Sequence, residues 1–299
     1  MEEVKEVIAD MNGRAPVAVV CEILGVARSS YYASVRGEKV PAKRGPKTEV
    51  SDERLTEAIR EVIEESPFYG EGYRKVWARL RFGRHRMRVG KRRVLRLMRL
   101  HGLLAPVRRV HKRGRRAHDG KIVTEVPNEM WGADATKFWT EENGWCWFFG
   151  VVDHFNSECV GWTVEEVGDR WAAMESLRCG VRRVFGSFGK DVARGVRLRH
   201  DWGSQYTARD FQADLRFAGL ESTPAYVGEP ECNGVVERFI RTLKEQCIWV
   251  HRFRDIEEAR EIIGEFIERY NEGWILERLG YRTPVQARVD YYRECMEAA

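Results

Sequence analysis

Apolar residues recur at helical intervals in the first part of the chain. One such pattern starts after Ser51, which can cap a helix, a second surrounds Trp77, and a third runs from about Gly90 to His101. The apolar positions of the first pattern are Leu55, Ile59, Val62 and Ile63. Three short helices with tight connections predict a helix-turn-helix module over residues 51–107.

The third helical pattern separates two kinds of side chain. Its apolar residues share one face, which indicates the side that faces a core. Arg92, Arg96 and Arg99 lie on a different side. This arrangement favours a DNA-recognition helix, and an ordinary surface helix with arginines for solubility is the alternative.

From Val126 onward the pattern changes to short strands and then to alternating helices and strands. The expected strands cover about residues 131–136, 145–152, 158–165 and 196–200, with a short element near 223–227. The expected helices cover about residues 169–184, 208–218 and 256–272, with another that carries Glu237. The first three strands are expected to pair as a meander, with Val160, Trp162 and Val164 on one side of the third. The pattern predicts a mixed α/β sheet.

Segments without periodicity mark the borders between these regions. Residues 36–50 contain two prolines and two glycines, which indicates a linker after an N-terminal helical segment, a partial helix-turn-helix, at residues 1–35. Residues 108–125 begin with a basic, glycine-containing run and are expected to form an arm that follows the DNA backbone. Residues 126–299 form the remaining, mixed region.

Charge is distributed unevenly along the chain. The formal net charge is +5, but residues 72–118 hold eighteen Lys or Arg and no Asp or Glu. A block of this density attracts polyanions, and the phosphate backbone of nucleic acid is the most common such partner. The alternative is a solvated basic face. The cations expected to contact DNA are Arg74, Lys75, Arg92, Arg93, Arg96, Arg99, Arg108, Arg109, Arg241 and Lys244.

The cysteines and the hydropathy of the chain indicate its cellular location. Seven cysteines form no C-x-x-C pair, and the odd number argues against a complete internal disulfide framework. The acidic start does not resemble a secretory signal, and the longest apolar run, residues 145–152, is too short to span a bilayer. We therefore expect a cytoplasmic protein without a membrane partner.

Three acidic residues stand at positions suited to chemistry. Asp134 lies within a strand, Asp201 follows a strand in Asp-Trp-Gly-Ser, and Glu237 lies near the start of a helix. Taken singly, each is more simply a turn, cap or helix-dipole residue. Lys244, seven residues after Glu237, lies about two helical turns further, so that a carboxylate and an ammonium face one region.

A cluster of these carboxylates would need a cation. Two unit charges about 4 Å apart repel by about 4 kcal/mol at an effective dielectric constant of about 20. Mg²⁺ prefers carboxylate and water oxygens, and a pair of such ions can support phosphodiester cleavage. Spacing alone does not show that the three side chains converge.

The motifs of the chain resemble those of insertion-sequence transposases of the IS-three family, second-frame product, which have a retroviral-integrase-like core. The matching motifs span nearly the whole chain and include Y-G-E-G-Y-R-K-V-W, W-G-A-D-A-T, D-W-G-S-Q-Y-T, N-G-V-V-E-R-F-I-R-T-L-K and L-G-Y-R-T-P. Asp201 and Glu237 are separated by 35 residues, the interval that gives the family its D,D(35)E name. Lys244 matches the family's basic residue seven positions after the glutamate.

The resemblance implies an RNase H-like fold for the core and catalysis by Asp134, Asp201, Glu237 and Lys244. It implies that the three carboxylates bind two Mg²⁺ or Mn²⁺ ions. Double-stranded DNA, as element ends and target, is the expected substrate of strand cleavage and transfer. A homo-oligomer in the synaptic complex, a first-frame helix-turn-helix protein as a further partner, and a nucleoid-associated location in a prokaryote are also expected.

Two departures and two rival functions accompany this interpretation. Residues 270–278 read Y-N-E-G-W-I-L-E-R where the family usually has Arg-Pro-His after Tyr-Asn, and Arg199-His200 stand where His-Ser is common. Gln205 and Tyr206 resemble residues that shape the family's site.

A structure-selective nuclease on the same fold, or an inactive DNA-binding regulator derived from an element, are the alternative functions.

Overall fold

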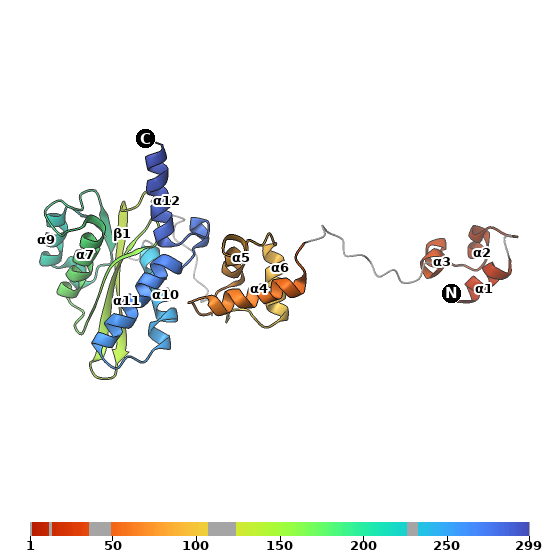
Figure 1. The fold of residues 1–299 in the computed structure, drawn as a ribbon, viewed down its shortest axis with the longest axis horizontal. Coiled ribbons are helices and arrows are strands. Elements are labelled where there is room, and N and C mark those ends of the chain that lie inside the picture. Colours follow the sequence, from red (N-terminus) through yellow and green to blue (C-terminus); the bar gives the residue numbers. More distant parts are fainter. Residues whose placement is uncertain (1, 12–13, 36–48, 107–123, 226–232, 299) are drawn as a thin grey trace. The chain divides into compact units, whose positions relative to one another are not determined.

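The computed structural model describes residues 2–11, 14–35, 49–106, 124–225 and 233–298, in two compact units, Met1–Ser51 and Asp52–Ala299. The first unit contains α1 (Glu2–Asp10), α2 (Val17–Ile23) and α3 (Arg28–Val35) (Figure 1). Val4, Val20 and Cys21 are its buried apolar residues among those described. Most of the predicted linker, residues 36–48, lies outside the described residues, as does most of the predicted basic arm, residues 107–123.

The second unit begins with the three predicted helices, α4 (Asp52–Glu65), α5 (Tyr73–Phe82) and α6 (Lys91–Leu100). Their apolar stripes meet, so that Leu55, Ile59, Val76, Leu80, Val94, Leu97 and Met98 are almost fully buried. Arg92, Arg96 and Arg99 lie on the exposed side of α6, as predicted. The helix ends at Gly102, whose positive φ of 68° suits glycine.

A five-stranded mixed sheet forms the centre of the unit. Its strands are β1 (Met130–Thr140), β2 (Gly144–Asp153), β3 (Cys159–Glu165), β4 (Arg197–His200) and β5 (Glu221–Pro224), in the order β3-β2-β1-β4-β5. The first three strands pair as the predicted antiparallel meander, and β4 and β5 continue the sheet in parallel. The mixed α/β sheet predicted for this region is confirmed.

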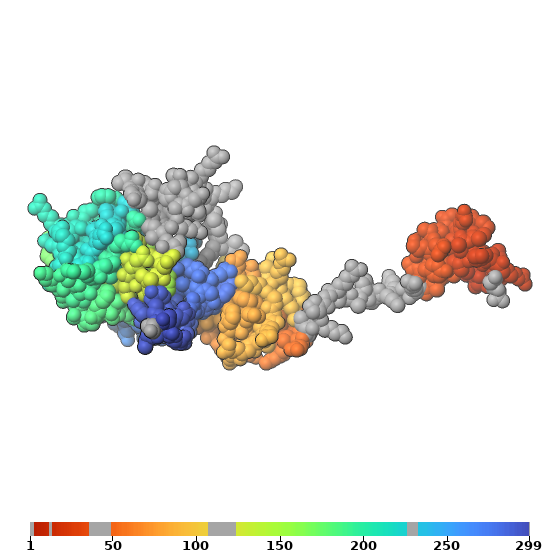
Figure 2. Space-filling model, turned by 90° about the horizontal axis from the view of Figure 1, so that it is seen from above, coloured from red at the N-terminus to blue at the C-terminus, as the bar shows by residue number. Residues whose placement is uncertain are grey.

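Helices cover both faces of the sheet (Figure 1). One face packs against α7 (Arg170–Phe185), α8 (Ser204–Thr207) and α9 (Arg209–Ala218), and the other against α10 (Gly234–Gln246) and α11 (Ile256–Gly273). Side chains alternate between two hydrophobic clusters along β2, where Phe149 and Val151 join the first and Phe148 and Val152 the second. Figure 2 shows the strands and the later helices, yellow to blue, as one continuous body.

The expected orientation of β3 is wrong at one residue. Trp162 and Val164 pack with the α11 face, whereas Val160 packs with the α7 face. The pairing of β3 with β2 passes from Val151↔Gly161 to Val152↔Cys159, so that Val160 is skipped. This β-bulge adds one residue and reverses the alternation, which a strict period of two cannot anticipate.

The helical module packs directly against the core. Phe68, in the turn after α4, belongs to the hydrophobic cluster under α11, and its ring meets Trp274 edge to face at 4.9 Å. The backbone N–H of Tyr69 donates to Gln246 Oε1, and Gln246 Nε2 donates to the Tyr69 carbonyl, both at 2.8 Å. These contacts connect the module to the last turn of α10.

The chain continues through η2 (Ile248–Val250) and η3 (Glu277–Leu279) to α12 (Pro284–Glu297). A capping box between Thr283 and Gln286 starts α12. Among the described residues, no helix is both long and apolar enough to cross a membrane.

Candidate active site

Asp134 lies in the central strand of the sheet, on the face that α10 covers. It shares this face with Gly132 and Phe138, two and four residues away along β1. Gly132 lies directly under α10, because a Cβ there would be 3.3 Å from Val236. The backbone N–H of Ala135 donates to Asp134 Oδ1 at 2.8 Å.

The pairing register of two parallel strands brings Asp201 to the same place. The last pair between β1 and β4 is Gly132↔Arg199, and two residues further along each chain stands an aspartate. Gly203 N donates to Asp201 Oδ1 at 2.9 Å, so the side chain also closes the turn after β4. Asp201 itself is exposed.

Glu237 reaches the site from the first turn of α10. The apolar stripe of this helix, Val236, Phe239, Ile240 and Leu243, is buried against the sheet, which fixes the rotation of the helix. Asn233, just before the helix, donates from Nδ2 to the carbonyl of Ala133 at 2.9 Å. This hydrogen bond ties the start of the Glu237 helix to the strand that carries Asp134.

Asp134 is influenced electrostatically by the other three predicted residues. Burial, together with the carboxylates of Asp201 and Glu237, raises the pKa of the Asp134 carboxyl to about 6, although the hydrogen bond from Ala135 N–H and the charge of Lys244 lower it. The structure therefore places all four within electrostatic reach. A half-buried position surrounded by like charges is unfavourable for a carboxylate and favourable for a bound cation.

The carboxylates do not form a closed ligand cage. Among the described residues, no three His, Cys, Asp or Glu side chains are close enough together to hold one ion. Each aspartate accepts the neighbouring N–H on Oδ1, and no described residue donates a hydrogen bond to Oδ2 of Asp134 or Asp201.

This site is also shaped by Gly132, Asn233 and His154, which the sequence analysis did not single out. A Cβ at Gly132 would lie 2.7 Å from Asn233 Oδ1 and 2.8 Å from His154 Nε2, so glycine allows both side chains to approach β1. Burial, with help from Arg199 and Arg278, lowers the pKa of His154 to about 4, which keeps the ring neutral. The sequence signal that could have pointed to Asn233 is the Asn-Gly pair before Glu237, but such a pair by itself predicts a helix cap.

His200 and Tyr206 support the loop that carries Asp201. His200 Nδ1 is 2.7 Å from the Asp201 carbonyl oxygen, and its Nε2 is 2.9 Å from Ser222 Oγ. The ring of Tyr206 stacks on His200 at 5.5 Å. Burial raises the pKa of Tyr206 well above its usual value, and Asp134 and Asp201 add to this effect.

Several of the predicted DNA-binding cations have protein partners. Arg93 and Arg96 pair with Asp52 at 2.7 and 2.6 Å. Arg74 pairs with Glu277 at 2.8 Å, and Arg241 pairs with Glu245 at 2.9 Å.

The remaining predicted cations differ in exposure. Lys75 Nζ lies 2.8 Å from the centroid of the Trp274 ring. Arg92 and Arg99 are exposed, and in the described part of the chain neither pairs with a carboxylate. Arg108 and Arg109 lie outside the described residues.

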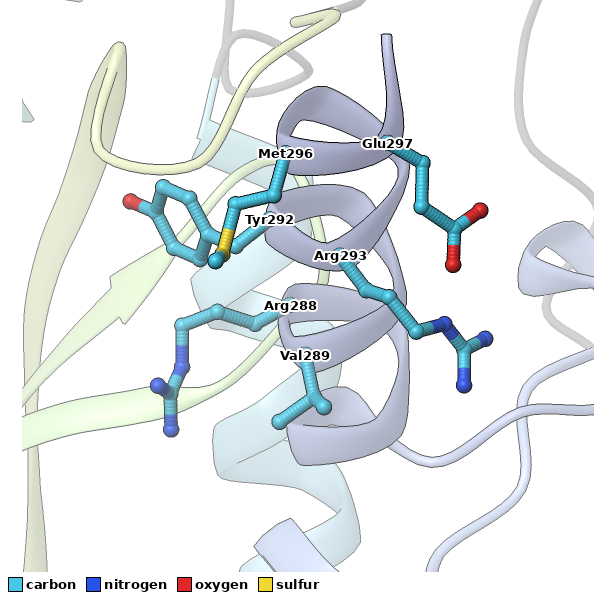
Figure 3. Close-up of a pocket in the computed structure, with 6 residues that line it drawn as sticks. All are labelled: Arg288, Val289, Tyr292, Arg293, Met296 and Glu297. Carbon is cyan, nitrogen blue, oxygen red and sulfur yellow. The ribbon is translucent and has the colours of Figure 1, made fainter. Parts of the chain in front are cut away.

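A hollow of about 590 Å³ lies elsewhere, along α12. Figure 3 shows that its lining side chains come from this single helix, among them Val289, Tyr292 and Met296. It contains no group of carboxylates, so it offers no second candidate for the chemistry considered above.

Comparison with known proteins gives matches along most of the chain. Models of an HTH-like domain and of two integrase core domains match residues 51–111, 125–230 and 219–284. Transposase InsD for insertion element IS2A/D/F/H/I/K of Escherichia coli is 30% identical over 274 residues, which cover 90% of this chain and 89% of the relative. InsD of insertion element IS2-9 from E. coli strain K12 is also 30% identical, with 90% and 87% covered.

Two solved structures resemble the chain more distantly. A chain of the simian T-cell lymphotropic virus intasome in complex with PP2A regulatory subunit B56 gamma aligns with a TM-score of 0.47 and 16% identity, over 80% of this chain and 74% of that chain. The catalytic core domain of BIV integrase aligns with a TM-score of 0.41 and 18% identity, over 56% and 99%.

Proposed function

Since this chain belongs to the DDE-type insertion-sequence transposases, we propose that Asp134, Asp201 and Glu237 are the carboxylates that carry its DNA strand cleavage and joining. The observation that supports this assignment is that the carboxylates of Asp201 and Glu237 lie close enough to Asp134 to raise the pKa of its carboxyl. Residues far apart in sequence rarely bring like charges to one half-buried place unless a function requires it.

Enzymes of this family depend on divalent metal ions, and we infer that the three carboxylates hold two Mg²⁺ or Mn²⁺ ions. The donor chemistry fits, because carboxylate oxygens are the ligands that Mg²⁺ prefers and Oδ2 of each aspartate is not used by a described residue. When bound, such ions neutralise charge and act as Lewis acids at a phosphodiester.

The chain's own residues supply position and charge. Lys244, seven residues after Glu237 on α10, holds a phosphate oxygen of the reacting strand beside the carboxylates. Asn233 keeps the start of α10 on β1 and so fixes where Glu237 lies relative to Asp134. Asn233 is a positioning residue in this proposal.

The DNA duplex is held mainly by the module and by cations outside the site. Arg92 and Arg99, which are exposed on α6, contact phosphates, and Arg108 and Arg109, which follow the module in the sequence, are proposed to add further phosphate contacts. Arg93 and Arg96 share the single carboxylate of Asp52 and so keep one net positive charge for DNA. Arg74 and Arg241, each paired with a glutamate, contact DNA by exchanging that carboxylate for a phosphate. Lys75, whose Nζ is buried against the Trp274 ring and lies 3.7 Å from Glu71, contributes charge and no direct contact.

The partners are proposed in the same terms. Element ends and target DNA are the substrates, and the active assembly is a homo-oligomer that brings two ends together. A first-frame helix-turn-helix protein joins this assembly, and the protein works at the nucleoid of a prokaryotic cell.

Glu237→Gln tests the assignment. The variant keeps the shape of the side chain but loses its charge, so we expect strand joining on end-bearing oligonucleotides with Mg²⁺ to fall on the order of 10²- to 10⁴-fold, corresponding to several kcal/mol of electrostatic stabilisation. Glu245→Gln, on the same helix and paired with Arg241, is the matched control and keeps activity. If Glu237→Gln joined strands at the wild-type rate, the assignment would be overturned. If the unmodified protein cleaved DNA but joined no strands, it would be a nuclease.

A further inference from the structure

A groove of about 490 Å³ opens beside Lys244, between the tip of the β1–β2 hairpin and the turn after α10. Side chains from both segments line it, and those used below are Lys137, Trp139, Trp145, Lys244, Trp249 and Arg252. None of these except Lys244 has a part in the function proposed above.

Exposed tryptophans form the walls of the groove. Trp139 and Trp145 are directly opposite one another on β1 and β2, and their rings meet edge to face at 5.5 Å. They are 55% and 60% exposed, and Trp249 on the facing turn is 67% exposed. Large apolar side chains so accessible to water, gathered in one place, indicate a binding surface.

The floor of the groove is fixed by structure on both sides. Phe138 and Phe253 are buried and their rings pack at 5.4 Å. The N–H of Glu141 donates to the Phe253 carbonyl at 3.0 Å, and Thr140 forms a β-bridge with Phe253. The two walls therefore keep their spacing without a ligand, which reduces the entropic cost of binding.

The groove is positively charged. Lys137, Lys244 and Arg252 line it together with one carboxylate, Glu141. Within the ranges that the structure describes, none of these three cations forms an ion pair, and Lys137 Nζ lies 4.6 Å from the centroid of the Trp147 ring. Cations beside accessible aromatic rings suit single-stranded nucleic acid, in which phosphates and base faces are both available.

We propose that this groove binds unpaired nucleotides of the DNA strand that reacts at the carboxylates, with bases stacked on Trp139, Trp145 and Trp249 and phosphates at Lys137 and Arg252. This rests on the proposed function, because Lys244 belongs to both the groove and the site and so sets where the strand enters. A duplex cannot occupy the groove in this way, since its base faces are covered by stacking.

The test compares binding of two DNA duplexes by the full chain, without metal, through fluorescence anisotropy. One duplex is fully paired at the element end and the other carries four unpaired nucleotides there. We expect Trp249→Ala and Trp145→Ala each to weaken binding of the unpaired substrate on the order of tenfold and binding of the paired duplex less than twofold. Trp249→Phe, which keeps an aromatic face, restores most of the loss.

Trp171→Ala is the matched control, because Trp171 is 53% exposed, lies at the start of α7 and does not line the groove. Equal losses for both substrates, or no loss for either, would overturn the proposal. A change in oligomeric mass of Trp249→Ala by sedimentation, with DNA binding unchanged, would overturn it in favour of a protein interface. The binding assay contains no metal and involves no strand joining, so failure of the catalytic assignment is read from the joining assay of Glu237→Gln alone.

Discussion

The helical module pairs its carboxylates with cations, whereas the candidate active site brings carboxylates near one another. In the module, Asp52 accepts from Arg93 and Arg96, and Glu71 accepts from Arg79, so that each carboxylate lies among cations. In the site, the carboxylates of Asp201 and Glu237 raise the pKa of the Asp134 carboxyl, and Lys244 is the cation that lowers it. The first arrangement lowers the energy of the folded chain, whereas the second raises it.

This difference separates residues that hold the fold from residues that do chemistry. An ion pair made within the module remains useful when no ligand is present. A group of like charges in a half-buried place is useful only when a cation or a reacting phosphate arrives. Substitutions in the two regions should therefore change stability and activity in opposite proportions.

The largest effect is expected from Asp134→Asn. Because the substitution removes one of three like charges, we expect the melting temperature in EDTA to stay constant or rise, while strand joining falls on the order of 10²- to 10⁴-fold. Mg²⁺ should raise the melting temperature of the wild type more than that of the variant. A melting temperature several degrees below that of the wild type in EDTA would show that Asp134 supports the fold and would break the contrast.

Glu71→Gln probes the opposite case. Glu71 is 8% exposed, receives two hydrogen bonds from Arg79 at 2.6 and 2.9 Å, and lies 3.7 Å from Lys75 Nζ. Leaving these cations without their carboxylate should lower the free energy of unfolding by about 3 kcal/mol, measured by urea denaturation. Glu57→Gln, at an exposed pair with Arg54, is the control and changes it by less than about 1 kcal/mol. Equal effects for both would contradict this account.

Within the module, paired and unpaired arginines should separate in DNA binding. Arg92→Ala with Arg99→Ala removes two exposed cations, so we expect the slope of log affinity against log salt to fall by about 0.9 for each phosphate that the variant no longer neutralises. Arg93→Ala with Arg96→Ala should change this slope less, because both side chains are paired with Asp52. Titration of a labelled duplex at several salt concentrations measures both, and the reverse order would place the DNA on the other side of α6.

The smallest effect is a pH dependence of stability at Asp52. Hydrogen bonds from Arg96 and Arg93 lower the pKa of this carboxyl to about 2. Because the folded pKa is below the unfolded value of about 3.9, its contribution is complete above pH 4 and disappears as the pH falls through 2. Asp52 is near the surface, so we expect less than about 1 kcal/mol in the difference between wild type and Asp52→Asn. A difference that grows as the pH falls below 4 would contradict the sign.

Much of the core was predictable because local pattern and long-range arrangement agree there. The three strands of the meander follow apolar runs, and the 35-residue interval singles out Asp201 and Glu237 by position along the chain. What the sequence could not supply is the reason that Asp201 lies near Asp134. That reason is the register Gly132↔Arg199, which depends on pairing between segments far apart in the chain.

Other features needed three dimensions for different reasons. Asn233 precedes a helix and so suggests a cap, but its side chain forms no cap hydrogen bond and instead holds β1. The basic block is compensated by Asp52 and Glu277, which lie outside its sequence window. The start of α12 was readable, since Thr283, Pro284 and Gln286 form a capping pattern, but it was not predicted.

The two hydrogen bonds between Gln246 and Tyr69 give α10 a second use. Glu237 and Gln246 are nine residues apart, about 14 Å along one helix axis, and the far end is fastened to the turn that follows α4. A helix of this length transmits displacement as a stiff rod. A displacement of the module when it binds DNA would therefore move Glu237 at the opposite end of α10. This helix mechanically couples the binding of a DNA end to its alignment for reaction.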